Sequence, residues 1–209
     1  FIHFIYCIFM KIEPFKSLPK NGEALFKDRG SKHFGFAFGI DSLEKAKQKI
    51  SEIRAEHNTA NHHCFAYIIE SDILIKRSSD DGEPNNSSGP PILKQIEKYD
   101  LTNVLVVVVR YFGGTKLGVG GLMNAYKLAA AGALENATID MIVPISDWLI
   151  CTDYSNISFL NQLLSSLQIE ILNETSAQQY CLSIRIKNHI FINLKTKLET
   201  IKYTLNEIN

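Results

Sequence analysis

The hydrophobic pattern of the chain is strongest over residues 104–109, where successive positions are all valine or leucine. A strand that is apolar at every position is buried on both faces of its sheet. The pattern therefore predicts a central strand over 104–110. A helix of small residues is predicted over 122–135, because Leu122, Tyr126 and several alanines share one face at helical spacing.

The part of the chain before this strand alternates between strand-like and helix-like patterns. Apolar runs on either side of Gly30 predict a hairpin. The sequence Asp41-Ser42-Leu43-Glu44 resembles a capping box and predicts the start of a helix, whose apolar face ends at His57. Further predicted elements are strands over 64–69 and 73–76, a loop over 78–91 and a short helix opened by Pro90 and Pro91.

Beyond residue 144 the elements follow a different order. Helical spacing is present over 159–167 and 192–201, and short strand-like runs surround these segments. The order strand, helix, strand, strand, helix, strand is the ferredoxin-like βαββαβ pattern. The chain is therefore predicted to be an α+β protein of two domains, with an N-terminal domain over 1–137, a linker over 138–144 and a ferredoxin-like domain over 145–209.

Composition and charge exclude few classes of protein. The 209 residues are 45% hydrophobic, enough for two small domains with cores of their own. The 22 basic and 22 acidic residues cancel, so any contact with nucleic acid depends on a local patch. Residues 1–9 are apolar but too few to span a bilayer, and we expect them to be an extension of the reading frame or an artefact. No other segment indicates a membrane.

The cysteines are Cys7, Cys64, Cys151 and Cys181, and none belongs to a C-x-x-C motif. Their scatter predicts reduced thiols and a cytoplasmic location. Cys151 and Cys181 lie in apolar runs, where we expect them to pack as small hydrophobic side chains.

The best candidate site is the glycine-rich loop that follows the central strand. Glycine allows a positive φ or the close approach of a ligand to the backbone. The loop amides, Arg110, Lys116 and the next helix N-terminus would together suit an anion such as phosphate. The candidate ligand-binding residues are Arg110, Tyr111, Gly113, Gly114, Lys116, Gly118, Gly120 and Gly121.

The loop matches no standard phosphate motif. Val119 stands where the P-loop lysine belongs, and Met123 replaces the last glycine of G-x-G-x-x-G. A tight strand-to-helix connection explains the glycines equally well. Both interpretations stay open at the level of sequence.

Two groups of polar residues precede the loop. His57, His62, His63 and Cys64 are zinc-type donors, but their spacing fits no standard finger, so we expect no metal. The acids at 80, 81 and 83 would suit Mg²⁺ beside a phosphate, although an ordinary turn is the favoured interpretation. No cofactor is predicted apart from this possible Mg²⁺. We predict one polar cleft near the glycine loop, formed by His57, His62, Cys64, Asp80, Asp81 and Glu83.

Three motifs carry a family resemblance. The chain reads Arg-Tyr-Phe-Gly-Gly-x-Lys-Leu-Gly-x-Gly-Gly-Leu from Arg110, preceded by Asp80-Asp81-Gly82-Glu83-Pro84 and by His57…His62-x-Cys64-x-Ala66. In this order they resemble the IMPACT/YigZ family, over a segment from about Gly30 to Leu134. The resemblance implies the bacterial two-domain plan, with a first domain like domain IV of the ribosomal translocation GTPase and a ferredoxin-like second domain.

The chain departs from the family pattern at two positions. Pro90 stands where relatives usually have an arginine after the acidic motif. Asn124 stands where they usually have an arginine before Ala-Tyr. If these cations hold a phosphate in relatives, this chain is expected to grip it differently.

The resemblance implies a cytoplasmic binding protein in the control of translation or stress, with RNA or the ribosome as partner and no particular oligomeric state. The rival hypothesis is a metal-assisted enzyme acting on a phosphate-containing small molecule or nucleic acid. In that case Asp80, Asp81 and Glu83 would be the metal ligands. No nucleophile–base constellation is legible, so binding is favoured.

Overall fold

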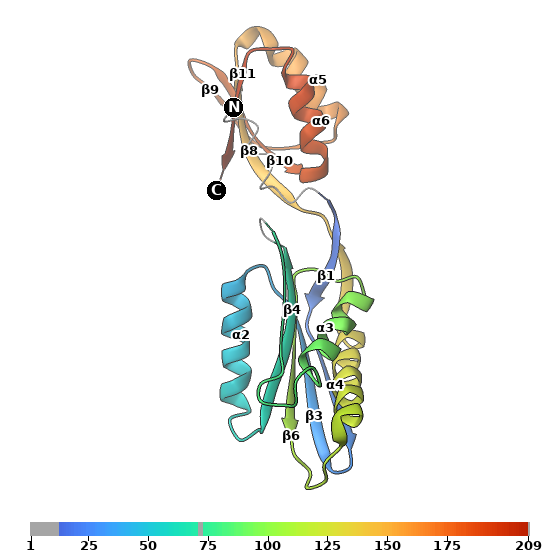
Figure 1. Ribbon diagram of the computed structural model, residues 1–209. Helices are drawn as coiled ribbons and strands as arrows, with labels where there is room; N and C mark the ends of the chain where they lie inside the picture. Colours follow the sequence, from blue (N-terminus) through green and yellow to red (C-terminus); the bar gives the residue numbers. More distant parts are fainter. Residues whose placement is uncertain (1–12, 71–72, 209) are drawn as a thin grey trace. The chain divides into compact units, whose positions relative to one another are not determined.

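The computed structural model of the chain describes residues 13–70 and 73–208 (Figure 1). The expectation for residues 1–9 lies outside this part. The described residues divide into two compact units, one covering Phe15–Ile142 and the other containing the described residues from Val143 onward. Both units combine helices with antiparallel strands, so the chain is an α+β protein.

The first unit is built on a five-stranded antiparallel sheet in the order β2-β3-β6-β4-β5. Its central strand, β6, is buried from Val104 to Arg110, which explains the unbroken apolar run in the sequence. The predicted hairpin around Gly30 is the pair β2–β3. The strands are β2 (Gly22–Asp28), β3 (Ser31–Gly39), β4 (His62–Glu70), β5 (Leu74–Ser79) and β6 (Val104–Tyr111).

Helices cover both faces of this sheet (Figure 1). α2 (Leu43–Glu56) packs on one face, while α3 (Gly89–Lys98) and α4 (Gly118–Glu135) pack on the other. The N-cap of α2 is Ser42, whose hydroxyl accepts a hydrogen bond from the Lys45 N–H at 3.4 Å. The helix thus begins one residue later than a capping box at Asp41 would place it.

One predicted helix start is wrong. α4 begins at Gly118 and not at 122, so three of the five loop glycines lie in its first turns. The buried side chains of Leu117 and Leu122 anchor that end of the helix despite the weak helix propensity of glycine. The division between the two units, after Ile142, falls within the predicted segment 138–144. That segment is largely strand, because β7 (Thr138–Ile142) pairs with the unpredicted strand β1 (Phe15–Lys20).

The second unit is a four-stranded antiparallel sheet in the order β11-β8-β10-β9, with α5 and α6 on one face (Figure 1). Trp148 packs against Phe191 in its core, with ring centroids 4.3 Å apart. The elements follow in the predicted order, with a short 3₁₀ turn before α5. They are β8 (Ile145–Thr152), η1 (Tyr154–Asn156), α5 (Ile157–Ser166), β9 (Glu170–Ser176), β10 (Tyr180–Lys187), α6 (Asn188–Leu198) and β11 (Tyr203–Ile208).

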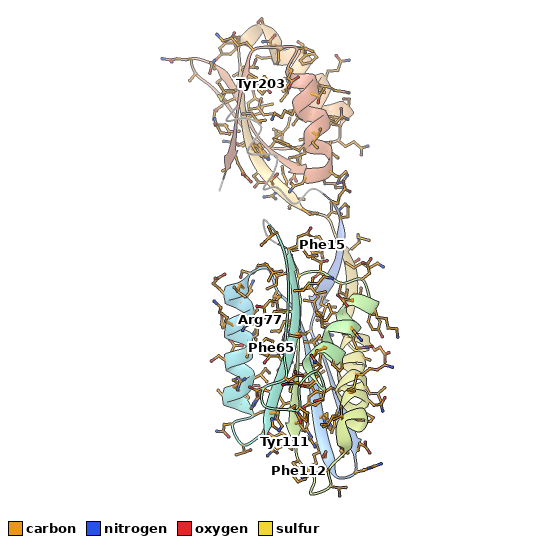
Figure 2. All side chains as sticks on the ribbon, in the orientation of Figure 1. Phe15, Phe65, Arg77, Tyr111, Phe112 and Tyr203 are labelled. Atoms are coloured by element: carbon orange, nitrogen blue, oxygen red, sulfur yellow. A yellow bond between two sulfur atoms is a disulfide. The ribbon has the colours of Figure 1, made fainter. Side chains whose placement is uncertain are left out.

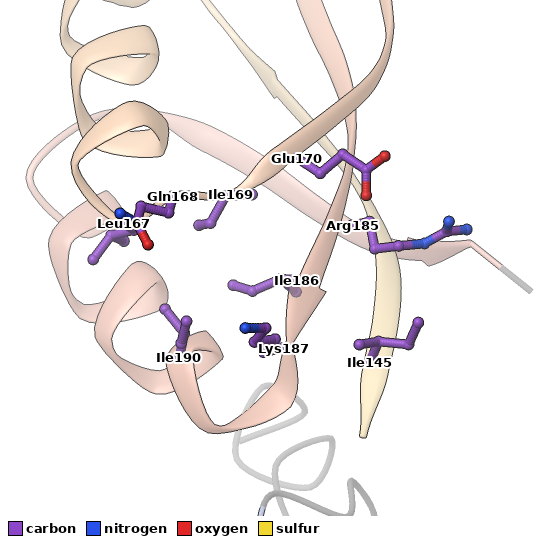
Figure 3. A pocket seen from close by; sticks show the side chains of 9 residues that line it. All are labelled: Ile145, Leu167, Gln168, Ile169, Glu170, Arg185, Ile186, Lys187 and Ile190. Carbon is purple, nitrogen blue, oxygen red and sulfur yellow. The ribbon is translucent and has the colours of Figure 1, made fainter. Parts of the chain in front are cut away.

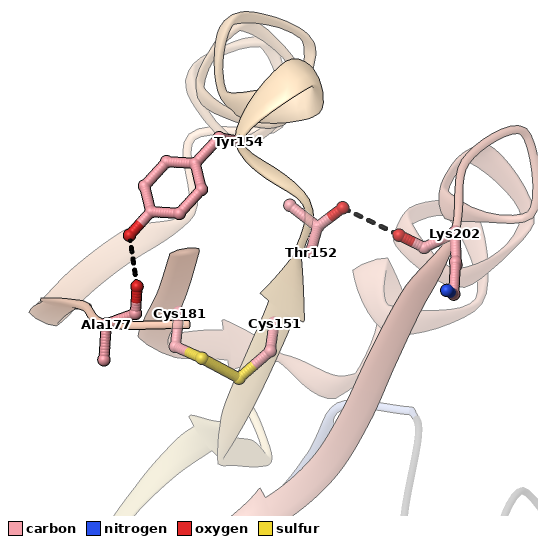
Figure 4. The surroundings of a disulfide bond; sticks show 6 residues. All are labelled: Cys151, Thr152, Tyr154, Ala177, Cys181 and Lys202. Atoms are coloured by element: carbon pink, nitrogen blue, oxygen red, sulfur yellow. Dashed lines mark hydrogen bonds between the residues drawn. A yellow bond between two sulfur atoms is a disulfide. The ribbon is translucent and has the colours of Figure 1, made fainter. Parts of the chain in front are cut away.

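The prediction of reduced thiols is wrong for two of the cysteines. Cys151 on β8 and Cys181 on β10 are directly opposed in the antiparallel register and form a disulfide, with Cα atoms 4.1 Å apart (Figure 4). Their 30-residue separation in sequence concealed this proximity. Cys64 is a free, buried thiol. Cys7 lies outside the described residues.

None of the helices within residues 13–70 and 73–208 is both long enough and apolar enough to cross a membrane.

Candidate functional site

The glycine loop is the exposed connection between β6 and α4, from Phe112 to Lys116. Gly113 is required by packing, since a Cβ there would lie 1.9 Å from the carbonyl carbon of Gly30. Gly114 and Gly118 have positive φ values of 86° and 73°, which favour glycine. The fold alone therefore accounts for these three glycines.

Neither packing nor a positive φ explains why position 120 is a glycine. It is exposed in the first turns of α4, its φ is not positive, and a Cβ built on it would meet nothing within 4 Å. Alanine would be the better helix former at such a position. The open backbone at Gly120 is therefore available to something outside the described chain.

The loop amides fall into two groups. The N–H of Phe112 donates to the Asn61 side-chain oxygen at 2.8 Å, and the N–H of Gly113 donates to the Ser31 hydroxyl at 3.1 Å. Among the described residues, the N–H groups of residues 114–116 have no hydrogen-bond acceptor. The three residues are exposed, so their amides are free to receive a ligand.

The loop leads directly into the positive end of an 18-residue helix. The N-cap residue Leu117 gives α4 no side-chain cap, and its first turn contains no acidic residue. Lys116 is exposed and makes no ion pair within residues 13–70 and 73–208. Free amides, helix terminus and lysine together form a local positive patch suited to an anion.

An aromatic pocket of about 320 Å³ adjoins the loop. Figure 2 labels two of its side chains, Tyr111 and Phe112, at the end of β6. Phe112 is 47% exposed, and the His57 ring nitrogen Nδ1 lies 2.9 Å from the Tyr111 hydroxyl. The pocket is lined by Gly30, Lys32, Phe34, His57, Tyr111 and Phe112.

Arg110 is a buried residue of β6, two positions before the loop begins at Phe112, and its side chain is not available to a ligand bound at the loop. Its guanidinium is 7% exposed and donates to the Glu83 carboxylate at 2.6 Å. The Tyr126 hydroxyl donates to the same oxygen at 2.8 Å, and burial raises the pKa of Tyr126. The predicted role of Arg110 as an exposed phosphate ligand does not agree with this geometry.

His33 completes the buried group. Arg110 is opposed to His33 on β3 and to His62 on β4, so the three side chains point to one face of the sheet. Both ring nitrogens of His33 are buried without a hydrogen-bond partner among the described residues. Burial, together with the nearby Arg110 charge, lowers the pKa of His33 to about 4. His33 is therefore neutral at physiological pH.

Asp80 has a structural role at the start of α3. Its carboxylate accepts hydrogen bonds from the N–H groups of Asn86, Ser88 and Gly89, at 2.8, 3.0 and 2.8 Å, and from the Ser88 hydroxyl at 2.7 Å. Burial opposes ionisation, but these donors outweigh it and lower the pKa of Asp80. The neighbouring Cys64 thiol donates to the Asp80 carbonyl oxygen at 3.1 Å, and burial raises its pKa to about 12.

Asp81 connects the loop that carries Asp80, Asp81 and Glu83 to α2, the helix that covers the other face of the sheet from α3 and α4. One carboxylate oxygen pairs with Arg54 of α2, and the other accepts the His63 N–H at 2.6 Å. Its carbonyl oxygen lies 2.9 Å from His62 Nδ1. All three carboxylates of the loop thus have protein partners, and no group of three metal-binding side chains is found within the described residues.

The structure brings together most of the predicted cleft but not all of it. Two side chains of β4, His62 and Cys64, contact the acidic loop, which is the segment that carries Asp80, Asp81 and Glu83. His57 instead lines the aromatic pocket on the α2 side of the sheet. The two groups are connected on the α2 side, because Asp81 pairs with Arg54 of α2 and the His63 ring nitrogen Nε2 lies 3.1 Å from the His57 carbonyl oxygen.

Sequence reasoning missed His33 and the hydroxyl of Tyr126. Alternation along β3 places His33 on the same face as the buried Ser31 and Gly35, and this pattern was a usable signal. Tyr126 was recognised as a core residue, but the partner of its hydroxyl became clear only when Glu83 was placed in space.

The two positions that depart from the family pattern lie in one place. Pro90 and Asn124 both line a groove of about 720 Å³ between α3 and α4.

The second unit has a smaller cavity of about 210 Å³, shown with its lining side chains in Figure 3. Its rim carries Arg185, which pairs with Asp147 through two hydrogen bonds of 2.9 and 2.8 Å.

Comparison with known proteins agrees with the motifs. The Impact N-terminal domain matches residues 29–134. The IMPACT family member YigZ of Escherichia coli is 35% identical over 64% of this chain and 66% of its own length. A crystal structure of a hypothetical protein covers 95% of this chain and 98% of its own, with a TM-score of 0.66 and 26% identity. The two-domain translational regulator Yih1 covers 60% and 49%, with a TM-score of 0.39 and 28% identity. The chain belongs to the IMPACT family.

Proposed function

We propose that the first unit binds single-stranded RNA, free or within the ribosome, at the end of the sheet that carries the glycine loop. The observation that supports this most directly is the run of three free amides at residues 114–116, which leads past Lys116 into an uncapped helix. A cytoplasmic role in the control of translation or stress is the part of the proposal that comes from the family resemblance alone.

The proposed contact has two parts. A backbone phosphate lies against the free amides and Lys116, where Gly120 allows close approach. A neighbouring base stacks on the exposed ring of Phe112, beside Tyr111 and Lys32. Aromatic platforms next to basic groups are the usual way in which proteins hold single strands without reading their sequence.

The finer fold assignments belong to the same proposal. We infer that the second unit is a ferredoxin-like domain, which its element order and the strand order β11-β8-β10-β9 support. The likeness of the first unit to domain IV of the translocation GTPase rests on the family resemblance.

The test is the affinity for a single-stranded oligonucleotide at several salt concentrations. Lys116→Ala is expected to weaken binding and to lower the slope of log affinity against log salt by about 0.7, the value for one phosphate contact on a single strand. Lys47→Ala is the matched control, because Lys47 is also exposed but lies on α2. Equal slopes for both variants and the unmodified protein would exclude the loop as the contact.

Two further variants separate the parts of the contact. Phe112→Ala is expected to lose about 1–3 kcal/mol of binding free energy, the usual value of one stacked base. Gly120→Ala is expected to weaken binding and yet stabilise the unit by up to about 1 kcal/mol, because alanine is the better helix former in open space. A Gly120→Ala variant that binds as well as the unmodified protein would show that nothing approaches this backbone.

A measurement of phosphate release, made beside the affinity assay, separates binding from metal-assisted catalysis. Release of phosphate that depends on Mg²⁺ and is lost in Asp81→Asn, without measurable RNA affinity, would favour the enzyme. The binding proposal expects instead that Asp81→Asn leaves RNA affinity unchanged, since Asp81 is held by Arg54 and by the His63 N–H.

A further inference from the structure

The groove between α3 and α4 has a volume of about 720 Å³. It lies on the face of the sheet opposite α2 and is formed entirely within the first unit. Its size is in the range of sites that hold several side chains of a ligand. Nothing in the proposed RNA contact requires it, apart from Gly120 at one end.

The walls of the groove carry one sign of charge. Lys94 and Lys98 project from α3 one helical turn apart, and Lys127 projects from α4. Among the described residues that line the groove, none is acidic. Within residues 13–70 and 73–208, Lys94 and Lys127 make no ion pair, so their charges are uncompensated by the described chain.

The base of the groove is apolar with one polar group. Met123 is 41% exposed, and the buried Pro91 lines the same groove at the start of α3. A methionine adapts its shape to different apolar partners. Gln95 is only 5% exposed, and its side-chain oxygen has no hydrogen-bond partner among the described residues. A buried amide oxygen without a partner is uncommon, and a hydrogen-bond donor on a ligand would supply the partner that the Gln95 oxygen lacks.

We propose that this groove is a docking site for an acidic amphipathic helix of a partner protein. Acidic side chains at positions i and i+4 of that helix would face Lys94 and Lys98, since both pairs repeat at one turn. Its apolar side chains would cover Met123, in the helix-in-groove mode of recognition. This contact goes beyond the proposed RNA site and involves a different class of partner.

A protein helix fits these features better than RNA does. A sugar-phosphate backbone would satisfy the lysines but would leave the exposed Met123 side chain without an apolar contact. The described lining of the groove contains no aromatic side chain, so unpaired bases would have no surface there on which to stack. An acidic helix uses both the lysine walls and the apolar base.

The experiment measures binding of a synthetic helix-forming peptide to the full chain by fluorescence anisotropy. The peptide carries glutamates one turn apart on each flank and leucine and phenylalanine on the face between them. A second peptide has every glutamate replaced by glutamine. We expect the acidic peptide to bind at least about tenfold more tightly than the glutamine peptide, and the difference to shrink as salt is raised.

Variants locate the contact. Lys94→Glu combined with Lys127→Glu is expected to weaken binding of the acidic peptide by at least about tenfold. Lys47→Glu makes the same change of charge per site on α2 and is expected to have little effect. Met123→Ser is expected to weaken both peptides, which charge alone would not do.

Three results would overturn the proposal. One is the absence of binding by the acidic peptide. Another is an equal loss in Lys47→Glu, which would show that the attraction is not local to the groove. The third is an oligonucleotide whose binding is lost in the Lys94→Glu/Lys127→Glu protein while the peptide does not bind, which would assign the groove to nucleic acid.

Discussion

The buried ion pair between Arg110 and Glu83 offers the sharpest test of the structure. Replacing Arg110 with methionine keeps most of the side-chain volume but removes the cation. The Glu83 side chain, 3% exposed, then keeps the hydrogen bond from the Tyr126 hydroxyl and has His62 Nε2 at 3.9 Å, but has lost its arginine partner. Since a buried charge without its partner is strongly unfavourable, the change acts on folding and not on the surface.

The expected magnitude follows from the burial of both partners. Breaking such a pair reduces the free energy of unfolding by about 3–5 kcal/mol, a large fraction of the total for a small domain. Removing both charges, in Arg110→Met/Glu83→Leu, should recover most of this loss. It leaves the Tyr126 hydroxyl buried without an acceptor, at about 1–3 kcal/mol. Adding Tyr126→Phe should restore stability to near that of the unmodified protein.

Native-state hydrogen exchange at the β6 amides measures this series in the first unit. Trp148, the only tryptophan of the chain, lies in the second unit, and its fluorescence reports that unit separately. We expect the β6 amides to exchange fastest in the single variant Arg110→Met and more slowly in the double variant. In the triple variant they should exchange almost as slowly as in the unmodified protein. A loss below about 1 kcal/mol in Arg110→Met would refute the reasoning, because it would mean that the pair is solvated.

Three other predictions concern stability. The pKa of His33 is about 4 in the folded chain against 6.5 in the unfolded one, so only the unfolded chain takes up this proton between those values. The free energy of unfolding should therefore fall by as much as about 3 kcal/mol from pH 6.5 to 4, and His33→Leu should remove that part of the pH dependence in denaturant titrations. Cys151→Ala/Cys181→Ala should lower the stability reported by Trp148 fluorescence by up to about 3.5 kcal/mol, the loop-closure value for their separation of 30 residues; no change would mean that the disulfide does not form in solution. Asp80→Ala should reduce the unfolding free energy by about 2 kcal/mol in calorimetry, whereas Asp41→Ala, at an exposed position beside α2, should have a much smaller effect.

The elements that sequence predicted well have a pattern imposed by burial. β6 is apolar throughout because both of its faces are covered, and the helix α3 was marked by two prolines at its start. β7 was missed for the opposite reason. Its residues are almost all exposed, so no alternation of buried and exposed side chains distinguished this strand from a linker.

The candidate site divides in the same way. Sequence indicated the loop that carries Gly114 and Lys116, because glycine content is a local property. The sequence did not indicate which polar side chains are buried and paired with other protein groups, and are therefore not available to a ligand. Arg110 and Asp80 bind partners 27 and 8 residues away, and such pairings depend on how the strands are arranged in space. The disulfide was hidden for the same reason.

The pairing of β1 with β7 brings the two ends of the first unit together, with Phe15 opposite Ile142 in the register. A unit whose ends meet can be inserted into a surface loop of another protein, or joined end to end and reopened elsewhere, without long connecting segments. Residues 15–142 are thus organised as a cassette. Such a cassette can be moved between chains, or combined with different companion domains, while its own sheet stays intact.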